Sequence, residues 1–319
     1  NTRILPSGAG PLRALRVSIL GENALLFHAN LRRTIAYMEK NADWQWEITA
    51  HRPWFRFNLR ELFQYKDLLF RFVRRDIIAS YQQTILGPVW VFLQPLFTTF
   101  VYFIIFSRVA KIPTDGIPPL LFYLPGSIIW TYYADCITST MNTFQYNAYI
   151  FNKVYFPRLI VPLSSVLFHT FRISIQLLLF LAVCLFYFLK GTPMHFGWQI
   201  LLAPVMILIT ACFALGCGLI ISVLTAKYRD LDNIMQFLLR LFMFAAPVVY
   251  PASLVPQKYK FIFWINPLTP VIEIFRSSFL KPQPLPLGFF MLSLLTTCIV
   301  LITGIILFNK REIQIMDVI

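Results

Sequence analysis

Residues 160–189 read IVPLSSVLFHTFRISIQLLLFLAVCLFYFL, an apolar run whose only Lys or Arg is Arg172. A helix needs roughly 20 mostly apolar residues to cross the hydrocarbon core of a bilayer. This run is longer than that, and no glycine or acidic side chain interrupts it. The stretch therefore predicts a transmembrane helix and places the chain among integral membrane proteins.

Further apolar runs flank this one on both sides. Together they predict about six spans, at residues 88–106, 119–141, 160–189, 198–224, 234–250 and 289–308. Between the last two, the apolar stretches 261–264 and 271–280 are too short to span and are separated by Pro267 and Pro270. We expect two short re-entrant or periplasmic helices there, within an all-α integral membrane fold.

The composition agrees with a membrane protein. The 319 residues are 58% hydrophobic and 13% charged, with a mean hydropathy of +0.66, whereas soluble chains are about 25% charged. The net charge of +14 favours contact with anionic lipid head groups and a cytoplasmic location of the basic loops. The basic residues are scattered between apolar runs, so we expect membrane lipids and no nucleic acid as partners.

Lys and Arg residues are distributed unevenly among the predicted loops. The segments before the first span and after the last span, together with the loops between spans two and three and between spans four and five, carry most of these residues. They include Arg71, Arg74, Arg75, Lys153, Arg158, Lys227, Arg229, Lys310 and Arg311. The other loops carry Arg108, Lys111 and Lys190, and segment 253–286 adds Lys258, Lys260, Arg276 and Lys281 against the bias. The positive-inside rule predicts that both termini are cytoplasmic.

An amphipathic helix is predicted directly before the first span. Its apolar face consists of Leu59, Leu62, Phe63, Leu69, Phe70, Val73 and Ile77, and basic residues lie largely opposite. Such a helix is typical of the membrane surface, although a solvated helix of a soluble domain has the same pattern. We expect a cytoplasmic extension at 1–56, the interfacial helix and loop at 57–87, a transmembrane domain at 88–309 and a cytoplasmic tail at 310–319.

Few residues of this chain favour enzymatic chemistry. No Gly-Lys dipeptide occurs, so the chain has no phosphate-binding loop for ATP. Asp135, His169 and Arg172 are ionisable groups inside the predicted spans, and ionisable groups in lipid usually face a cavity or a partner. His169 and Arg172 share one helical face. The pattern leaves open whether these groups are functional or structural, and no metal-ligand spacing is present.

Aromatic residues make up 17% of the chain. Trp90, Tyr102, Trp130 and Tyr133 lie in the first two predicted spans. Sugar rings stack on aromatic planes, and a sliding polymer needs many weak, equivalent contacts. The four residues are therefore candidates for lining a glycan path, and the alternative is contact with lipid and the interface.

Four groups of motifs occur in a fixed order. The first is Arg75-Asp76, Tyr81 and Leu86-Gly87-Pro88-Val-Trp90 before the first span, and the second is Asn147 to Lys153-Val-Tyr-Phe-Pro157-Arg158. The others are Tyr228-Arg229-Asp230 and the series Pro247-Val-Val-Tyr250-Pro251, Asn266-Pro267-Leu268 and Glu273 to Arg276. From about residue 57 to the C-terminus, this order resembles the permease subunits of bacterial ABC exporters of O-antigen, capsular polysaccharide and teichoic acid.

The resemblance implies a half-transporter in the bacterial inner membrane. Two copies would form the pore as a homodimer, and two separate ATP-binding cassette subunits would hydrolyse ATP, so this chain would bind no cofactor itself. The lipid head group of a lipid-linked glycan would enter near Arg74, Arg75, Leu86 and Gly87. The ATPase would dock on Asn147, Lys153, Arg158, Tyr228, Arg229 and Asp230.

Two other functions are compatible with the residues. An ABC exporter of a small lipid or drug would have the same spans without a continuous aromatic path. A membrane-embedded acyltransferase or glycosyltransferase would use His169 or Asp135, and the purified chain alone would then turn over a donor substrate.

Overall fold

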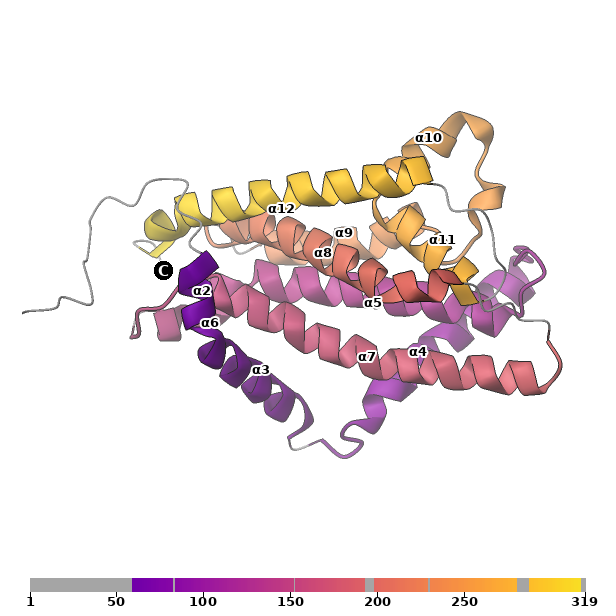
Figure 1. Ribbon diagram of the computed structural model, residues 1–319, viewed down its shortest axis with the longest axis horizontal. Helices are drawn as coiled ribbons and strands as arrows, with labels where there is room; N and C mark the ends of the chain where they lie inside the picture. The colour runs from indigo at the N-terminus through magenta and orange to yellow at the C-terminus, as the bar shows by residue number, and fades with distance from the viewer. Residues whose placement is uncertain are drawn as a thin grey trace, which may run out of the picture. The chain divides into compact units, whose positions relative to one another are not determined.

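A computed structural model of the chain describes residues 59–82, 84–151, 153–192, 198–228, 230–279 and 287–316. The chain divides into two compact units, Asn1–Pro53 and Trp54–Ile319, and every described residue belongs to the second. The predicted extension at 1–56 lies outside the described residues. Within the described ranges the chain forms helices joined by turns and loops, which confirms the all-α prediction (Figure 1).

Two helices occupy the predicted amphipathic segment. Helix α2 (Leu59–Gln64) and helix α3 (Lys66–Tyr81) are separated at Tyr65, which has φ −95° and ψ 18°. No residue of α3 is fully buried, and the helix packs against α7. The helix therefore lies at the edge of the bundle, with much of its surface open to its surroundings.

The turn after α3 leads into the first long apolar helix. Gly87 has φ +50°, a left-handed conformation that glycine adopts without steric cost. Pro88 caps α4 (Val89–Tyr102), which continues as the π-helix η1 (Phe103–Val109). Pro95 lies inside α4, as helices in a membrane tolerate when neighbouring groups satisfy the freed carbonyl.

Helix α5 (Pro119–Met141) is the central element of the bundle. It begins with a proline at its first position, where no backbone N–H is needed. It packs against α4, α7, α8 and α11, and most of its residues are buried. Its 23 residues extend over about 34 Å, and helix α6 (Thr143–Phe151) follows.

Three further long helices complete the apolar bundle. Helix α7 (Ile160–Leu189) ends before Gly191, whose φ of +81° is typical of a helix C-terminus. The 3-10 turn η2 (Trp198–Leu202) precedes α8 (Ala203–Thr225), and α12 (Leu287–Met316) is the last helix. Among the described residues, four helices are long and apolar enough to cross a membrane: Val89–Val109, Ile160–Leu189, Ile200–Thr225 and Leu287–Arg311.

Small residues allow α8 to approach its neighbours closely. A Cβ atom at Gly304 of α12 would lie 2.6 Å from the Gly216 carbonyl oxygen, and one at Gly218 would lie 2.5 Å from Thr140 Cβ on α5. The sequence places Gly218 in a stripe with Ala214 and Ser222, a pattern that predicts close packing. The contact between Gly218 and α5 confirms that prediction.

The predicted fifth span, 234–250, is not one continuous helix. Helix α9 (Leu231–Phe242) has 12 residues, and the 3-10 turn η3 (Met243–Ala245) follows it. Ala246 is extended, with φ −116° and ψ 153°, because a residue that precedes a proline disfavours the helical conformation. A helix of 12 residues is about 18 Å long, so α9 alone is shorter than a bilayer core.

Two short helices precede the last long helix, as the proline spacing predicts. They are α10 (Gln257–Ile265), after the 3-10 turn η4 (Ala252–Leu254), and α11 (Leu268–Phe279). Arg276 of α11 is buried, lies 3.1 Å from Glu273 and donates to the Pro247 carbonyl oxygen at 2.8 Å. Its guanidinium lies 3.7 Å from the centre of the Phe122 ring. These contacts attach α11 to α5 and to the segment after α9.

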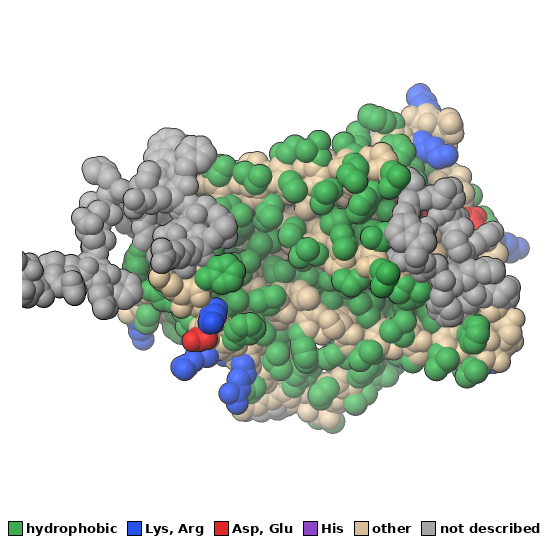
Figure 2. All heavy atoms as spheres, in the orientation of Figure 1, with side chains coloured by type: hydrophobic (Ala, Val, Ile, Leu, Met, Phe, Trp, Pro, Cys, Tyr) green, Lys and Arg blue, Asp and Glu red, His purple; other side chains and the backbone are tan. Residues whose placement is uncertain are grey.

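Different helices lie at the two ends of the described bundle. Helices α2 and α6 and the end of α12 lie at one end, and α10 and α11 lie at the other (Figure 1). Between the ends, apolar side chains are exposed along α7, α8 and α12 (Figure 2). A broad exposed apolar surface of this kind fits contact with lipid.

Candidate functional site

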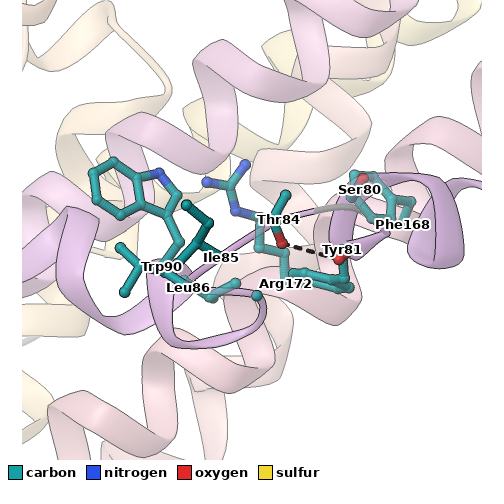
Figure 3. A pocket seen from close by; sticks show the side chains of 10 residues that line it. Ser80, Tyr81, Thr84, Ile85, Leu86, Trp90, Phe168 and Arg172 are labelled. Carbon is teal, nitrogen blue, oxygen red and sulfur yellow. Dashed lines mark hydrogen bonds between the residues drawn. The ribbon is translucent and has the colours of Figure 1, made fainter.

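A cavity of about 610 Å³ lies beside the turn that joins α3 to α4. We call it the turn cavity, and Figure 3 shows the residues around it. Its lining consists of Ser80, Tyr81, Thr84, Ile85, Leu86, Gly87, Trp90, Val91, Phe168 and Arg172. The cavity therefore combines the end of the amphipathic helix, the first long apolar helix and one basic side chain of α7.

A second cavity, of about 550 Å³, lies between α3, α5, α6 and α7. We call it the α6 cavity. Its lining consists of Arg75, Asp76, Asp135, Thr138, Ser139, Tyr146, Asn147, Tyr149, Ser165, His169 and Arg172. Arg172 lines both cavities. Most of the other lining side chains are polar or charged, in contrast to the apolar surface of the bundle.

A smaller cavity of about 340 Å³ lies next to both. It shares Ser80 and Phe168 with the turn cavity, and Asp76 and His169 with the α6 cavity. The three cavities share lining residues beside α3, and we refer to them together as the α3 groove. The groove extends from the turn at Gly87 to α6.

A polar cluster from three helices lies inside this groove. Arg172 of α7 donates through Nη1 to Asp135 Oδ2 of α5 at 3.3 Å, and through Nη2 to Gln94 Oε1 of α4. His169 Nδ1 lies 4.0 Å from the same Asp135 oxygen and has no hydrogen-bond partner. The three ionisable groups that the sequence singles out inside the spans are therefore brought together at one place.

Three of the four residues predicted for a head-group entrance line one of these cavities. Leu86 and Gly87 line the turn cavity, and Arg75 lines the α6 cavity. Arg75 is paired with Asp76 at 2.8 Å, whereas Arg74 is exposed and lines neither cavity. Sequence reasoning did not assign Arg172 to this entrance, although its position inside an apolar run was the available signal.

The four aromatic residues proposed for a glycan path are not brought together. Trp90 is 49% exposed and lines the turn cavity. Tyr102 donates its hydroxyl to Met243 Sδ at 2.9 Å. Trp130 and Tyr133 are 7% and 9% exposed inside the bundle, where they contact each other. Of the four, Trp90 lines the turn cavity, and a path through all four stays a prediction.

The described residues among those predicted to dock an ATPase lie at the α6 end of the bundle. Lys153, Tyr228 and Asp230 are exposed, and the Arg158 guanidinium lies 6.0 Å from the centre of the Phe151 ring. Asn147 lines the α6 cavity and donates to the Thr143 carbonyl oxygen at 3.1 Å. Arg229 lies outside the described residues.

Hydrogen bonds tie the two predicted docking segments together. Gln145 Nε2 donates to the Thr225 carbonyl oxygen at 2.9 Å, and Thr225 Oγ1 donates to the Met141 carbonyl oxygen at 2.6 Å. Asn142 Nδ2 donates to Asp232 Oδ1 at 2.9 Å. The junction of α5 with α6 is thus fixed to the junction of α8 with α9, a link that no sequence motif indicates.

The ABC-2 type transporter family matches residues 67–280, from α3 into the segment after α11. The chain therefore belongs to this family of membrane permeases, whose members work with an ATP-binding subunit. It is 26% identical over 263 residues to an O-antigen export system permease protein RfbA of Klebsiella pneumoniae, covering 82% of this chain and 98% of that protein. An RfbA of Myxococcus xanthus is 28% identical over 223 residues, covering 69% and 83% of the two chains. The polysialic acid transport protein KpsM of Escherichia coli is 23% identical over 246 residues, covering 75% and 91%.

Proposed function

We propose that this chain is the membrane subunit of an ABC exporter that moves a lipid-linked polysaccharide across the bacterial inner membrane. Two copies form the pore, and two separate ATP-binding subunits supply the energy. The family match over residues 67–280, together with relatives named for O-antigen and polysialic acid transport, carries this proposal. The four motif groups of the sequence all lie within that matched region.

The α3 groove supports a substrate with a polar head and an apolar tail. Ile85, Leu86 and Trp90 give the turn cavity an exposed apolar rim. Arg75 and Arg172 lie further along the groove, each paired with a carboxylate, Asp76 and Asp135 respectively. A lipid that carries a phosphate would place its chain against the rim and its head group inside the groove, because each part then meets a surface of matching chemistry.

The end of the bundle at α6 is proposed as the cytoplasmic face that docks the ATP-binding subunits. It carries Lys153, Arg158 and Tyr228, in agreement with the positive-inside rule. The bonds between Asn142 and Asp232 and between Gln145 and Thr225 make this surface one unit. A rigid unit transmits a movement of the ATPase to α5 and α9 better than separate loops would.

The glycan itself would pass along aromatic side chains. Trp90 already lines a cavity, and Trp130 and Tyr133 are buried in the bundle. We propose that Tyr102, Trp130 and Tyr133 become accessible when the helices separate during transport. Each sugar-aromatic contact would contribute on the order of 1 kcal/mol, weak enough for a polymer to slide.

An export assay with charge reversal tests the proposal. In cells that lack the chain, lipid-linked polymer should accumulate inside and be absent from the surface. Arg158→Glu should reproduce this defect, because it replaces a positive charge of the proposed docking surface with a negative one. Lys111→Glu, at the opposite end of the bundle, is the matched control. Normal surface polymer in cells without the chain would contradict the proposal.

A further inference from the structure

We infer that Arg172 receives the phosphate of the substrate's head group, and that it does so by exchanging Asp135 for that phosphate. The inference rests on the proposed function and assigns a binding residue to it. The ligand class is a phosphate or diphosphate ester of a lipid.

The position of Arg172 supports this role. Its side chain extends from α7 toward residues 80–90 (Figure 3), lines both the turn cavity and the α6 cavity, and keeps 21% of its surface exposed. A guanidinium offers five N–H donors in a planar fork that matches phosphate oxygens. A head group can therefore contact Arg172 from the turn cavity as well as from the α6 cavity.

Arg172 makes two hydrogen bonds, through Nη2 to Gln94 and through Nη1 to Asp135, and the bond to Asp135 is one that a phosphate can replace. Its Nη1 lies 3.3 Å from Asp135 Oδ2, whereas good charge-assisted bonds measure about 2.7–2.9 Å. The Asp135 side chain is 32% exposed, so the pair is open to the groove. A diphosphate carries more negative charge than one carboxylate and can bind the guanidinium with two parallel bonds.

His169 can hold Asp135 after the exchange. A carboxylate left without a partner in a membrane protein is costly. His169 Nδ1 lies 4.0 Å from the same Asp135 oxygen, is buried and has no hydrogen-bond partner. A small movement would let His169 donate to Asp135 once Arg172 has turned to the phosphate. The cluster thus contains a partner for each charge in both states.

Neighbouring groups complete a head-group site. Ser80, Tyr81 and Thr84 line the turn cavity and carry hydroxyl groups that can donate to phosphate oxygens. Thr84 Oγ1 now donates to the Tyr81 carbonyl oxygen at 2.9 Å, a bond within the turn (Figure 3). The apolar rim at Ile85 and Leu86 lies next to these hydroxyls, which places the phosphate at the boundary between lipid chain and groove.

The test is a binding measurement on the full chain with its ATP-binding partner in nanodiscs. The probes are undecaprenyl diphosphate, undecaprenol and phosphatidylglycerol, and bound lipid is measured by native mass spectrometry. Arg172→Gln should weaken binding of the diphosphate by about tenfold. Asp135→Asn should tighten it severalfold, because it removes the competing carboxylate. Arg172→Lys, which keeps the charge, should bind more tightly than Arg172→Gln.

The two substitutions are expected to change diphosphate binding in opposite directions, and this distinguishes an exchange of partners from an ion pair that is only structural. If both substitutions weaken binding, or neither changes it, the inference is wrong while the proposed function stands. If the unaltered chain binds undecaprenol as tightly as the diphosphate, phosphate recognition fails and both proposals lose their support. Opposite effects with phosphatidylglycerol instead would support the exchange and assign the anchor to a phospholipid. Asp135→Asn preserves the size of the side chain. The direction in which it changes diphosphate binding therefore tests the exchange even if Arg172→Gln folds poorly.

Discussion

Replacing Gly304 by alanine tests the close approach of α12 to the backbone of α8. The added Cβ would lie 2.6 Å from the Gly216 carbonyl oxygen and 3.2 Å from Gly216 Cα. These are backbone atoms, so no side chain can rotate away and α8 and α12 must separate locally. Overpacking of this kind costs about 1–3 kcal/mol, and the better helix propensity of alanine offsets up to about 1 kcal/mol.

Gly288→Ala is the matched control on the same helix. A Cβ there would meet no atom within 4 Å, so this substitution should leave stability unchanged or raise it by up to about 1 kcal/mol. We expect Gly304→Ala to unfold at a temperature several degrees below Gly288→Ala, measured by thermal unfolding of the purified chain in detergent. Equal midpoints for the two variants, or a higher midpoint for Gly304→Ala, would refute the close approach of α8 to α12.

Three further outcomes are expected. Arg276→Met should destabilise the chain by about 3–5 kcal/mol, because it removes the buried Arg276 guanidinium and leaves the partly buried Glu273 carboxylate without its ion-pair partner. Thermal unfolding should show that the double variant Glu273→Gln with Arg276→Met is less destabilised than Arg276→Met alone. Asn142→Ala should lower the amount of polymer exported per ATP hydrolysed, since it releases α9 from α5, and an unchanged ratio would argue against mechanical coupling there. In a cysteine-free background, Lys111→Cys should react with an impermeant thiol reagent in intact cells and Lys153→Cys should not; the reverse pattern would invert the orientation.

Apolar run length predicts some of the long helices well, and four of the six predicted spans correspond to described helices that are long and apolar enough to cross a membrane. The run 160–189 is helix α7 without a residue of difference, because a span is a local property of composition. The predicted fifth span fails as a continuous helix, since hydropathy averages over Pro247 and the helix ends before it. The end of this helix is set by the backbone restriction on the residue before a proline, and the average hydropathy of a segment contains no information about that restriction.

The polar cluster was only half visible in the sequence. Spacing of three places His169 and Arg172 on one face of a helix, and the family resemblance concerns other positions. That Asp135 lies opposite Arg172 depends on the rotation of α5 against α7, which side-chain packing across the whole bundle sets. The same rotation buries Trp130 and Tyr133 beside each other, and their positions in the sequence could not tell which neighbours their side chains would meet.

Reconstitution tests the central claim most directly. The purified chain and its ATP-binding partner would be placed in vesicles that contain undecaprenyl diphosphate-linked polysaccharide, and glycan that crosses the membrane would be measured with a lectin confined to the far side. We predict ATP-dependent appearance of glycan at the lectin, abolished when this chain is omitted or when ATP cannot be hydrolysed. ATP-dependent movement of a small lipid or drug with no movement of glycan would contradict the account, as would turnover of a donor substrate by the chain alone.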